Sequence, residues 1–275
     1  MTFWQSVLAF LDSSMETPAS FGLFHLFWLA LTFLALIPLC RFPKIQSHDH
    51  VRRVVLVTAI VVILLEVYKQ INYSFSYENG VVYDYQWYAF PFQFCSTPMY
   101  IGLLAGLIRK GKLHDSLAAY LATYAMFAGL AVMIYPNDVF VSTIGINIQT
   151  MICHGSMITI GIYLFASDHV KLQHRTILKA MPVFAVTVGM AAIMNEVAYQ
   201  VGLLETETFN MFYISPHCDP HLLIYSDVQK VVPFPFSLII YILGFTAAAY
   251  LILLIAMGIG KLIGRLQPAK AAAVN

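Results

Sequence analysis

Charged side chains are scarce in this chain of 275 residues, at 11% of the total against roughly 25% in soluble domains. A soluble protein needs polar side chains to cover its surface, and a chain that is 60% hydrophobic has too few of them. The net charge is only +1, and no basic run exceeds a few residues. These shortages exclude an ordinary cytosolic enzyme, a disordered protein and a nucleic-acid binder. Lipid must therefore solvate most of the chain.

Cysteine is also rare, and the spacing of Cys40, Cys95, Cys153 and Cys218 matches no zinc or haem signature. The first residues lack the basic stretch and small-residue cleavage site of a signal peptide. Their hydrophobic side chains instead fall on one helical face, which predicts a short helix lying in the membrane interface within residues 1–20. No metal ion and no cofactor is predicted.

Seven apolar stretches approach the length of about 20 residues that spans a bilayer. We place them at residues 21–40, 54–73, 90–108, 117–135, 141–166, 180–204 and 235–263. The expected fold is an all-α membrane protein: an interfacial segment at 1–20, a seven-helix transmembrane domain at 21–263 with an outer loop at 205–234, and a cytoplasmic tail at 264–275. The predicted location is the cell membrane.

Basic residues follow the first, third, fifth and seventh predicted spans, and 13 of the 15 lysines and arginines lie in these connections. Acidic residues collect in the alternate connections. Because basic loops stay on the cytoplasmic side, this alternation predicts an outer N-terminus and a cytoplasmic C-terminus.

Polar side chains occur in five of the predicted spans, where hydrocarbon does not solvate them. An ionisable residue at mid-membrane costs roughly 2.5–3.5 kcal/mol, so such residues usually face the interior of the bundle. With the predicted topology they fall mostly in the outer half, which indicates a polar cavity there; interhelical hydrogen bonds are the alternative. The candidates are His25, Glu66, Lys69, Gln70, Gln93, Cys95, Asn147, His154, Asn195 and Glu196.

Cys95 and His154 are a candidate nucleophile and base. A thiol is a weak nucleophile until a neighbouring imidazole takes its proton, and Glu66, Asn195 or Glu196 could orient that imidazole. From spacing alone, a packed cysteine and a hydrogen-bonded histidine remain the alternative. Lys69 can either hold a lipid phosphate or pair with Glu66 one turn earlier, and the pair is favoured.

Short motifs spread along the chain resemble those of one family. They are FGLFHL at 21–26, FPFQFC at 90–95, CHG at 153–155, NMFYI at 210–214 and PFPF at 233–236. In this order they resemble the YwaF family of bacterial integral membrane proteins, related to the animal transmembrane protein 164 acyltransferases. One departure is Gln93, which stands where many members have a histidine. A glutamine, unlike a histidine, cannot shuttle a proton.

The resemblance implies a lipid acyltransferase independent of coenzyme A, with Cys95 as nucleophile and His154 as base. Its partners would be membrane phospholipid and lysophospholipid, with no protein partner predicted. Gln70, Gln93 or Asn195 would be available to stabilise the oxyanion. Hydrolysis of the acyl group in place of its transfer is left open.

Three other functions are compatible with the sequence. A seven-span sensor or receptor would bind a lipid or small ligand in the same cavity, although the last span has no lysine from Phe236 to Gly260 for a retinal Schiff base. A transporter usually shows internal repeats, and none is visible. A zinc-dependent lipid hydrolase needs several histidines in the spans. The outer-loop set His217, Cys218, Asp219 and His221 predicts a rigid turn rather than a zinc site.

Overall fold

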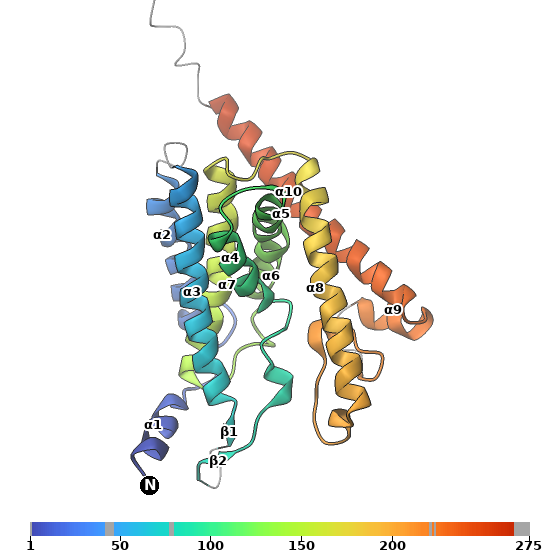
Figure 1. Ribbon diagram of the computed structural model, residues 1–275. Helices are drawn as coiled ribbons and strands as arrows, with labels where there is room; N and C mark the ends of the chain where they lie inside the picture. Colours follow the sequence, from blue (N-terminus) through green and yellow to red (C-terminus); the bar gives the residue numbers. More distant parts are fainter. Residues whose placement is uncertain (1, 42–46, 77–79, 220–221, 223, 267–275) are drawn as a thin grey trace, which may run out of the picture.

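The computed structural model describes residues 2–41, 47–76, 80–219, 222 and 224–266, and side chains as far as residue 262. Six long apolar helices run across the molecule, and the short helix α4 (Thr97–Leu107) lies between two of them, α3 and α5, which start at the same end (Figure 1). The six long helices are α2 (Leu23–Cys40), α3 (His48–Asn72), the continuous helix from α5 (Lys112–Tyr120) through η3 (Leu121–Ala125) to α6 (Met126–Ile134), α7 (Ile144–Ala166), α8 (Arg175–Gln200) and α10 (Phe236–Leu266). Their length and composition establish a multi-pass integral membrane protein.

Shorter elements connect these helices. They are α1 (Phe3–Leu11), the two-stranded antiparallel sheet of β1 (Phe75–Ser76) and β2 (Val82–Tyr83), η2 (Trp87–Ala89), α4 (Thr97–Leu107), η4 (Leu203–Glu205), η5 (Met211–Tyr213) and α9 (Tyr225–Val231). The predicted N-terminal helix forms as α1, where Thr2 and Gln5 make a capping box and no residue is buried. Its location in the membrane interface stays a prediction.

The segment predicted as the third span differs from the expectation. Among the described residues, six helices are long enough to cross a membrane, and here only the 11 residues of α4 are helical. Residues 90–96 form irregular backbone instead, because Pro91 interrupts the run and the Gln93 carbonyl accepts hydrogen bonds from the N–H groups of Ser96 and Thr97. Such backbone is tolerated at membrane depth only where protein covers it, which hydropathy cannot reveal. The count of seven spans stays a prediction.

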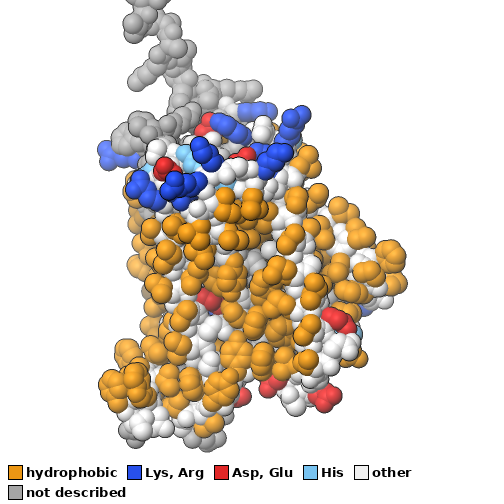
Figure 2. All heavy atoms as spheres, viewed as in Figure 1, with side chains coloured by type: hydrophobic (Ala, Val, Ile, Leu, Met, Phe, Trp, Pro, Cys, Tyr) orange, Lys and Arg blue, Asp and Glu red, His pale blue; other side chains and the backbone are white. Residues whose placement is uncertain are grey.

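The two ends of the bundle differ in charge. Lysine and arginine side chains gather at one end, above a wide hydrophobic zone (Figure 2). We call this the basic end; its residues include Arg41 after α2, Arg53 in α3, Lys110 between α4 and α5, and Arg175 in α8. The connections at the other end, the acidic end, carry Asp84, Asp138 and Glu205 among others. This separation agrees with the predicted alternation, while the assignment of the basic end to the cytoplasm stays a prediction.

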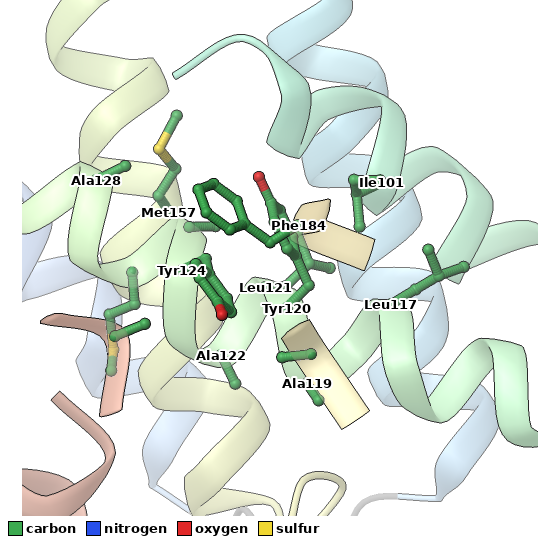
Figure 3. Close-up of a cluster of buried hydrophobic side chains, with 14 of the residues drawn as sticks. Ile101, Leu117, Ala119, Tyr120, Leu121, Ala122, Tyr124, Ala128, Met157 and Phe184 are labelled. Atoms are coloured by element: carbon green, nitrogen blue, oxygen red, sulfur yellow. The ribbon is translucent and has the colours of Figure 1, made fainter. Parts of the chain in front are cut away.

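A π-helical turn lies at the centre of the core. The turn Leu121–Ala125 interrupts the long α5–α6 helix and is completely surrounded by other elements, and its neighbours include Tyr120 and Phe184 (Figure 3). The Tyr124 ring stacks on Phe184 with centroids 4.5 Å apart. The Tyr120 hydroxyl lies 2.9 Å from Oγ1 of Thr97, the first residue of α4. Tyr120, the last residue of α5 before the π turn, therefore holds the start of α4 against the core.

The segment that follows α8 folds back into the bundle. Phe209, Met211, Phe212 and Ile214 are at most 4% exposed, as core residues are. Phe212 packs against Phe94, with ring centroids 5.6 Å apart. This part of the predicted outer loop therefore covers the irregular segment at residues 90–96 and gives it the protein environment that it needs.

α6 and α7 approach each other closely at Gly129. A Cβ at this position would lie 2.7 Å from the His154 carbonyl oxygen and 2.9 Å from the Met157 Cβ, so the backbone of α7 would have to move. We expect Gly129→Ala to destabilise the protein by about 1–3 kcal/mol. Gly189→Ala in α8 is the matched control, since nothing lies within 4 Å of its Cβ. Equal thermal unfolding midpoints for the two variants in detergent would contradict the close approach.

Candidate functional site

Cys95 lies in the irregular segment, directly before Ser96, the N-cap of α4. It is a free thiol and is partly buried. Lys69 and Glu66 of α3 lie close enough for their charges to act on it, and the Ser96 side chain is within hydrogen-bonding reach of the sulfur. Cys95 thus packs against the hydrophobic core just before a short helix, with the charges of Lys69 and Glu66 within electrostatic reach.

His154 lies in the middle of α7 and is 4% exposed. Its Nδ1 is 2.7 Å from the Thr150 carbonyl oxygen. Because a carbonyl only accepts, Nδ1 carries the proton of the neutral ring and Nε2 keeps a lone pair. That Nε2 is buried and has no hydrogen-bond partner among the described residues. A nitrogen fixed in this tautomer is equipped to accept a proton.

The structure brings the Cys95 segment against α7. The Cys153 sulfur lies 3.8 Å from the Cys95 carbonyl oxygen, and Cys153 directly precedes His154. The Cys95 thiol is not hydrogen-bonded to the His154 imidazole, because Nδ1 contacts Thr150 and Nε2 has no partner in the described part of the chain. The Cys95–His154 dyad therefore stays a prediction.

Glu66 is the centre of the polar side chains. It is 5% exposed and pairs with Lys69 at 3.0 Å, which confirms the predicted ion pair. Gln70 and Gln149 donate to its two oxygens at 2.9 and 3.2 Å. These three partners offset the free-energy cost of removing the Glu66 carboxylate from water. Gln149 was not predicted, although it is the residue through which α7 contacts this group.

Tyr85 extends the Glu66 network toward the acidic end. Its hydroxyl donates to Gln70 Oε1 at 2.6 Å, and the Gln70 amide nitrogen also donates to the Ala89 carbonyl. Burial, together with the nearby Glu66 carboxylate, raises the pKa of Tyr85. Its hydroxyl therefore keeps its proton and remains a donor at neutral pH.

Two of the predicted cavity residues hold the folded-back segment. Gln93 donates to the Asn210 carbonyl at 3.1 Å and accepts from the Phe212 N–H at 2.9 Å. Asn195 makes the same pair of bonds with Met211, at 2.9 and 2.7 Å. These amides, like that of Gln70, already donate to protein groups, so the predicted oxyanion role has no support here. Their visible role is to anchor backbone.

Two other predicted cavity residues are also structural. His25 accepts from the Phe21 N–H at Nδ1 and donates from Nε2 to the Met133 carbonyl, which joins α2 to α6 and uses both ring nitrogens. Asn147 binds both backbone groups of Val141 and shapes the turn before α7. Sequence patterns cannot separate these bridging groups from cavity groups, because both are polar residues within spans.

Glu196 lies apart from the other predicted cavity residues, so its place in a cavity stays a prediction. Its side chain is 50% exposed and contacts Gln200 and His217, which also stacks on Tyr199 at 3.6 Å. A helix presents neighbouring residues on different faces, so Asn195 points inward while Glu196 points out. His217 is thus engaged in an ion-pair contact, and His221 of the predicted rigid turn lies outside the described residues.

The backbone is strained where the folded-back segment meets Cys95. Phe212 and Tyr213 have φ angles of 58° and 56°, in the left-handed region that bulky residues avoid. Gln93 and Tyr241 hold the Phe212 N–H and carbonyl, and Tyr213 lies within electrostatic reach of Cys95. Strained backbone is often found at functional sites, and here it lies in the segment that packs on the ring of Phe94, directly before Cys95.

A pocket of about 420 Å³ opens between α3 and α4 beside this network. Glu66 and Gln70 are among its lining residues, and the rest are mainly apolar, such as Val67, Met99 and Tyr100. Val67 and Tyr100 are 51% and 37% exposed on the hydrophobic flank of the bundle. The pocket therefore faces the zone that lipid covers. Cys95 and His154 do not line it and lie deeper in the molecule.

The model of the TMEM164 family matches residues 20–257, most of the chain, and this agrees with the resemblance to YwaF-type membrane proteins. No curated protein and no solved structure matches the chain.

Proposed function

The chain belongs to the TMEM164 family, and we propose that it is a lipid acyltransferase that moves a fatty acyl chain between phospholipids through a thioester on Cys95. Family membership supports a membrane protein related to lipids. The resemblance of the motifs at Cys95 and His154 supports the reaction. The observation that carries the proposal is the buried lone pair of His154 Nε2, one residue from the point where α7 contacts the Cys95 segment.

In the first half-reaction, His154 Nε2 takes the proton of the Cys95 thiol. The thiolate attacks the ester carbonyl of a phospholipid, the C–S bond forms and the ester C–O bond breaks. His154 returns its proton to the departing alkoxide, which leaves as a lysophospholipid. Neither an oxidant nor coenzyme A enters the balance.

In the second half-reaction, the hydroxyl of another lysophospholipid gives its proton to His154 and attacks the thioester. A new ester C–O bond forms, the C–S bond breaks, and the thiolate recovers the proton. Water in place of the lysophospholipid would give hydrolysis. Burial of Cys95 and His154 behind the folded-back segment favours the lipid acceptor.

An intramembrane site suits this substrate. Each methylene that leaves the hydrocarbon costs about 0.8 kcal/mol, so an acyl chain moves most easily within the bilayer. The pocket between α3 and α4 is open on the hydrophobic flank and has the polar Glu66 and Gln70 at its inner side. It can admit an acyl chain sideways from the bilayer.

The thioester itself provides the test. Purified protein in nanodiscs would be given a phospholipid with a labelled acyl chain, without lysophospholipid, and quenched in acid. We expect label that hydroxylamine removes, on the peptide that contains Cys95. Label on Cys153 or Cys218 instead would contradict the proposal. Saturable lipid binding without any covalent label would favour the sensor or receptor.

A further inference from the structure

Three histidines from distant parts of the chain meet at the basic end. His48 is the first residue of α3, His114 lies in the first turn of α5, and His169 lies in the connection between α7 and α8. Their ligand nitrogens all lie within 4.8 Å of one another. Figure 2 shows histidine side chains among the basic residues of this end. This cluster has no role in the acyl transfer proposed above.

The two inner histidines are oriented toward each other. His114 Nε2 and His169 Nε2 are 2.8 Å apart, and His114 Nδ1 is 3.1 Å from the Ala105 carbonyl of α4. The carbonyl requires the proton on Nδ1, so Nε2 presents its lone pair to the cluster. A backbone carbonyl that fixes the tautomer of a ligand is the usual second partner of a metal-bound histidine.

The exposed side chain of His48 completes the cluster. The His48 ring centroid lies 5.0 Å from that of His114 and 4.4 Å from that of His169. The three rings therefore form one compact group at the basic end, with their ligand nitrogens close together.

We propose that His48, His114 and His169 form a binding site for a divalent transition-metal ion. Imidazole nitrogen suits Zn²⁺, Cu²⁺, Ni²⁺ and Co²⁺, and a three-histidine set leaves a fourth position for solvent or another donor. Tetrahedral bonds of about 2.05 Å place ligand nitrogens about 3.3 Å apart. Rotation of the exposed His48 and half-buried His169 side chains would bring the ligand nitrogens, now within 4.8 Å of one another, to this distance.

The surrounding charges limit which ions bind. The charge of Asp115 acts on both His114 and His169, and Asp115 is itself paired with Lys179 at 2.9 Å. Basic residues of α3 and of the α4–α5 connection lie at the same end. A hard cation such as Mg²⁺ or Ca²⁺ would find no carboxylate free of a partner at this cluster, whereas neutral imidazoles bind the softer ions through their lone pairs.

The site would tie three separate segments together. A bound ion would join the start of α3, the start of α5 and the α7–α8 connection, all at the end of the bundle opposite to the Cys95 segment. Ion binding and acyl transfer can therefore be measured independently.

The test uses full-length protein without a polyhistidine tag, freed of metal with a chelator, in detergent micelles. Titration with Co²⁺ is expected to give one equivalent of saturable binding with the visible absorption of a tetrahedral ion, and Zn²⁺ should displace it. His114→Gln and His169→Gln should each weaken binding at least about a hundredfold, since loss of a supporting partner alone costs 10–100-fold.

If His114→Gln or His169→Gln unfolds, His48→Gln becomes the deciding variant. His48 is exposed, so its replacement leaves the core intact. It should weaken binding at least about tenfold. His50→Gln, an exposed histidine two residues further along α3, is the matched control and should bind as the wild type does. Wild-type affinity in the His48 variant, or no saturable binding by the wild type, would overturn the proposal.

Discussion

Cys95→Ala is expected to reduce acyl transfer from phospholipid by at least about a hundredfold, the lower end of what a positioned proton transfer contributes. The reason is that alanine removes the only atom proposed to carry the acyl group. The same variant should show no thioester after acid quench. The measurement is the rate of labelled lysophospholipid acylation in nanodiscs.

His154→Ala should lose about as much activity as Cys95→Ala. If the thiol and imidazole act as one unit, the double variant should be no slower than either single variant, since neither group works without the other. A double variant whose losses multiply would show that the two residues act separately. The thermal unfolding midpoint of each variant is needed as well, because His154 is buried in α7.

Cys153→Ala is the matched control for both variants. Cys153 is the neighbour of His154, lies against the Cys95 segment and is as deeply buried as the histidine. Cys153 lines a small cavity of about 30 Å³ among α3, α4, η3 and α7, which marks a packing role. We expect nearly wild-type acyl transfer. A large loss of acyl transfer with Cys153→Ala, and none with Cys95→Ala, would show that Cys95 is not the nucleophile.

Much of the fold could be predicted from hydropathy. Long apolar runs place the helices to within a few residues for α2, α7 and α10, because hydrocarbon leaves the backbone no alternative to a helix. Hydropathy wrongly predicts a helix at residues 90–96, because it treats this backbone as surrounded by hydrocarbon. Their backbone is covered by residues 209–214, and a contact between segments more than 100 residues apart leaves no trace in local composition.

The candidate site could be predicted only in outline. Glu66 and Lys69 are one turn apart on α3, so their pairing follows from helical spacing. Gln149 and Glu66 are joined across helices, and that partner depends on how α7 is rotated. The amides of Gln93, Asn147 and Asn195 were recognised as polar residues within spans. Whether such an amide faces a cavity or a bent backbone is decided by loops whose path is not periodic.

The histidine cluster shows the same limit. His114 and His169 are 55 residues apart in the chain and meet only because α5 begins where α7 ends, at the same side of the bundle. Metal signatures in sequences rest on ligands a few residues apart. Ligands drawn from three separate segments carry no such spacing, so only the assembled bundle reveals them.

Glu66→Ala is expected to destabilise the protein by about 3–5 kcal/mol, the cost of leaving one charge of a buried pair without its partner. The Lys69 and Glu66 side chains are only 16% and 6% exposed, so solvent cannot replace the lost carboxylate. Gln70 and Gln149 would also lose their shared acceptor. Unfolding in detergent by heat or denaturant measures the effect.

Two comparisons separate the buried charge from the loss of packing. Glu66→Gln together with Lys69→Met removes both charges and keeps the volume, and it should recover most of the stability, because a neutral replacement of a buried pair is often tolerated. Asp227→Ala breaks the exposed Asp227–Lys230 pair, which has the same spacing and an N–O distance of 2.9 Å. Its stability should stay within about 0.5 kcal/mol of wild type. Equal losses of unfolding free energy for Asp227→Ala and Glu66→Ala would contradict the prediction. They would mean that water solvates Glu66 as it solvates the exposed Asp227.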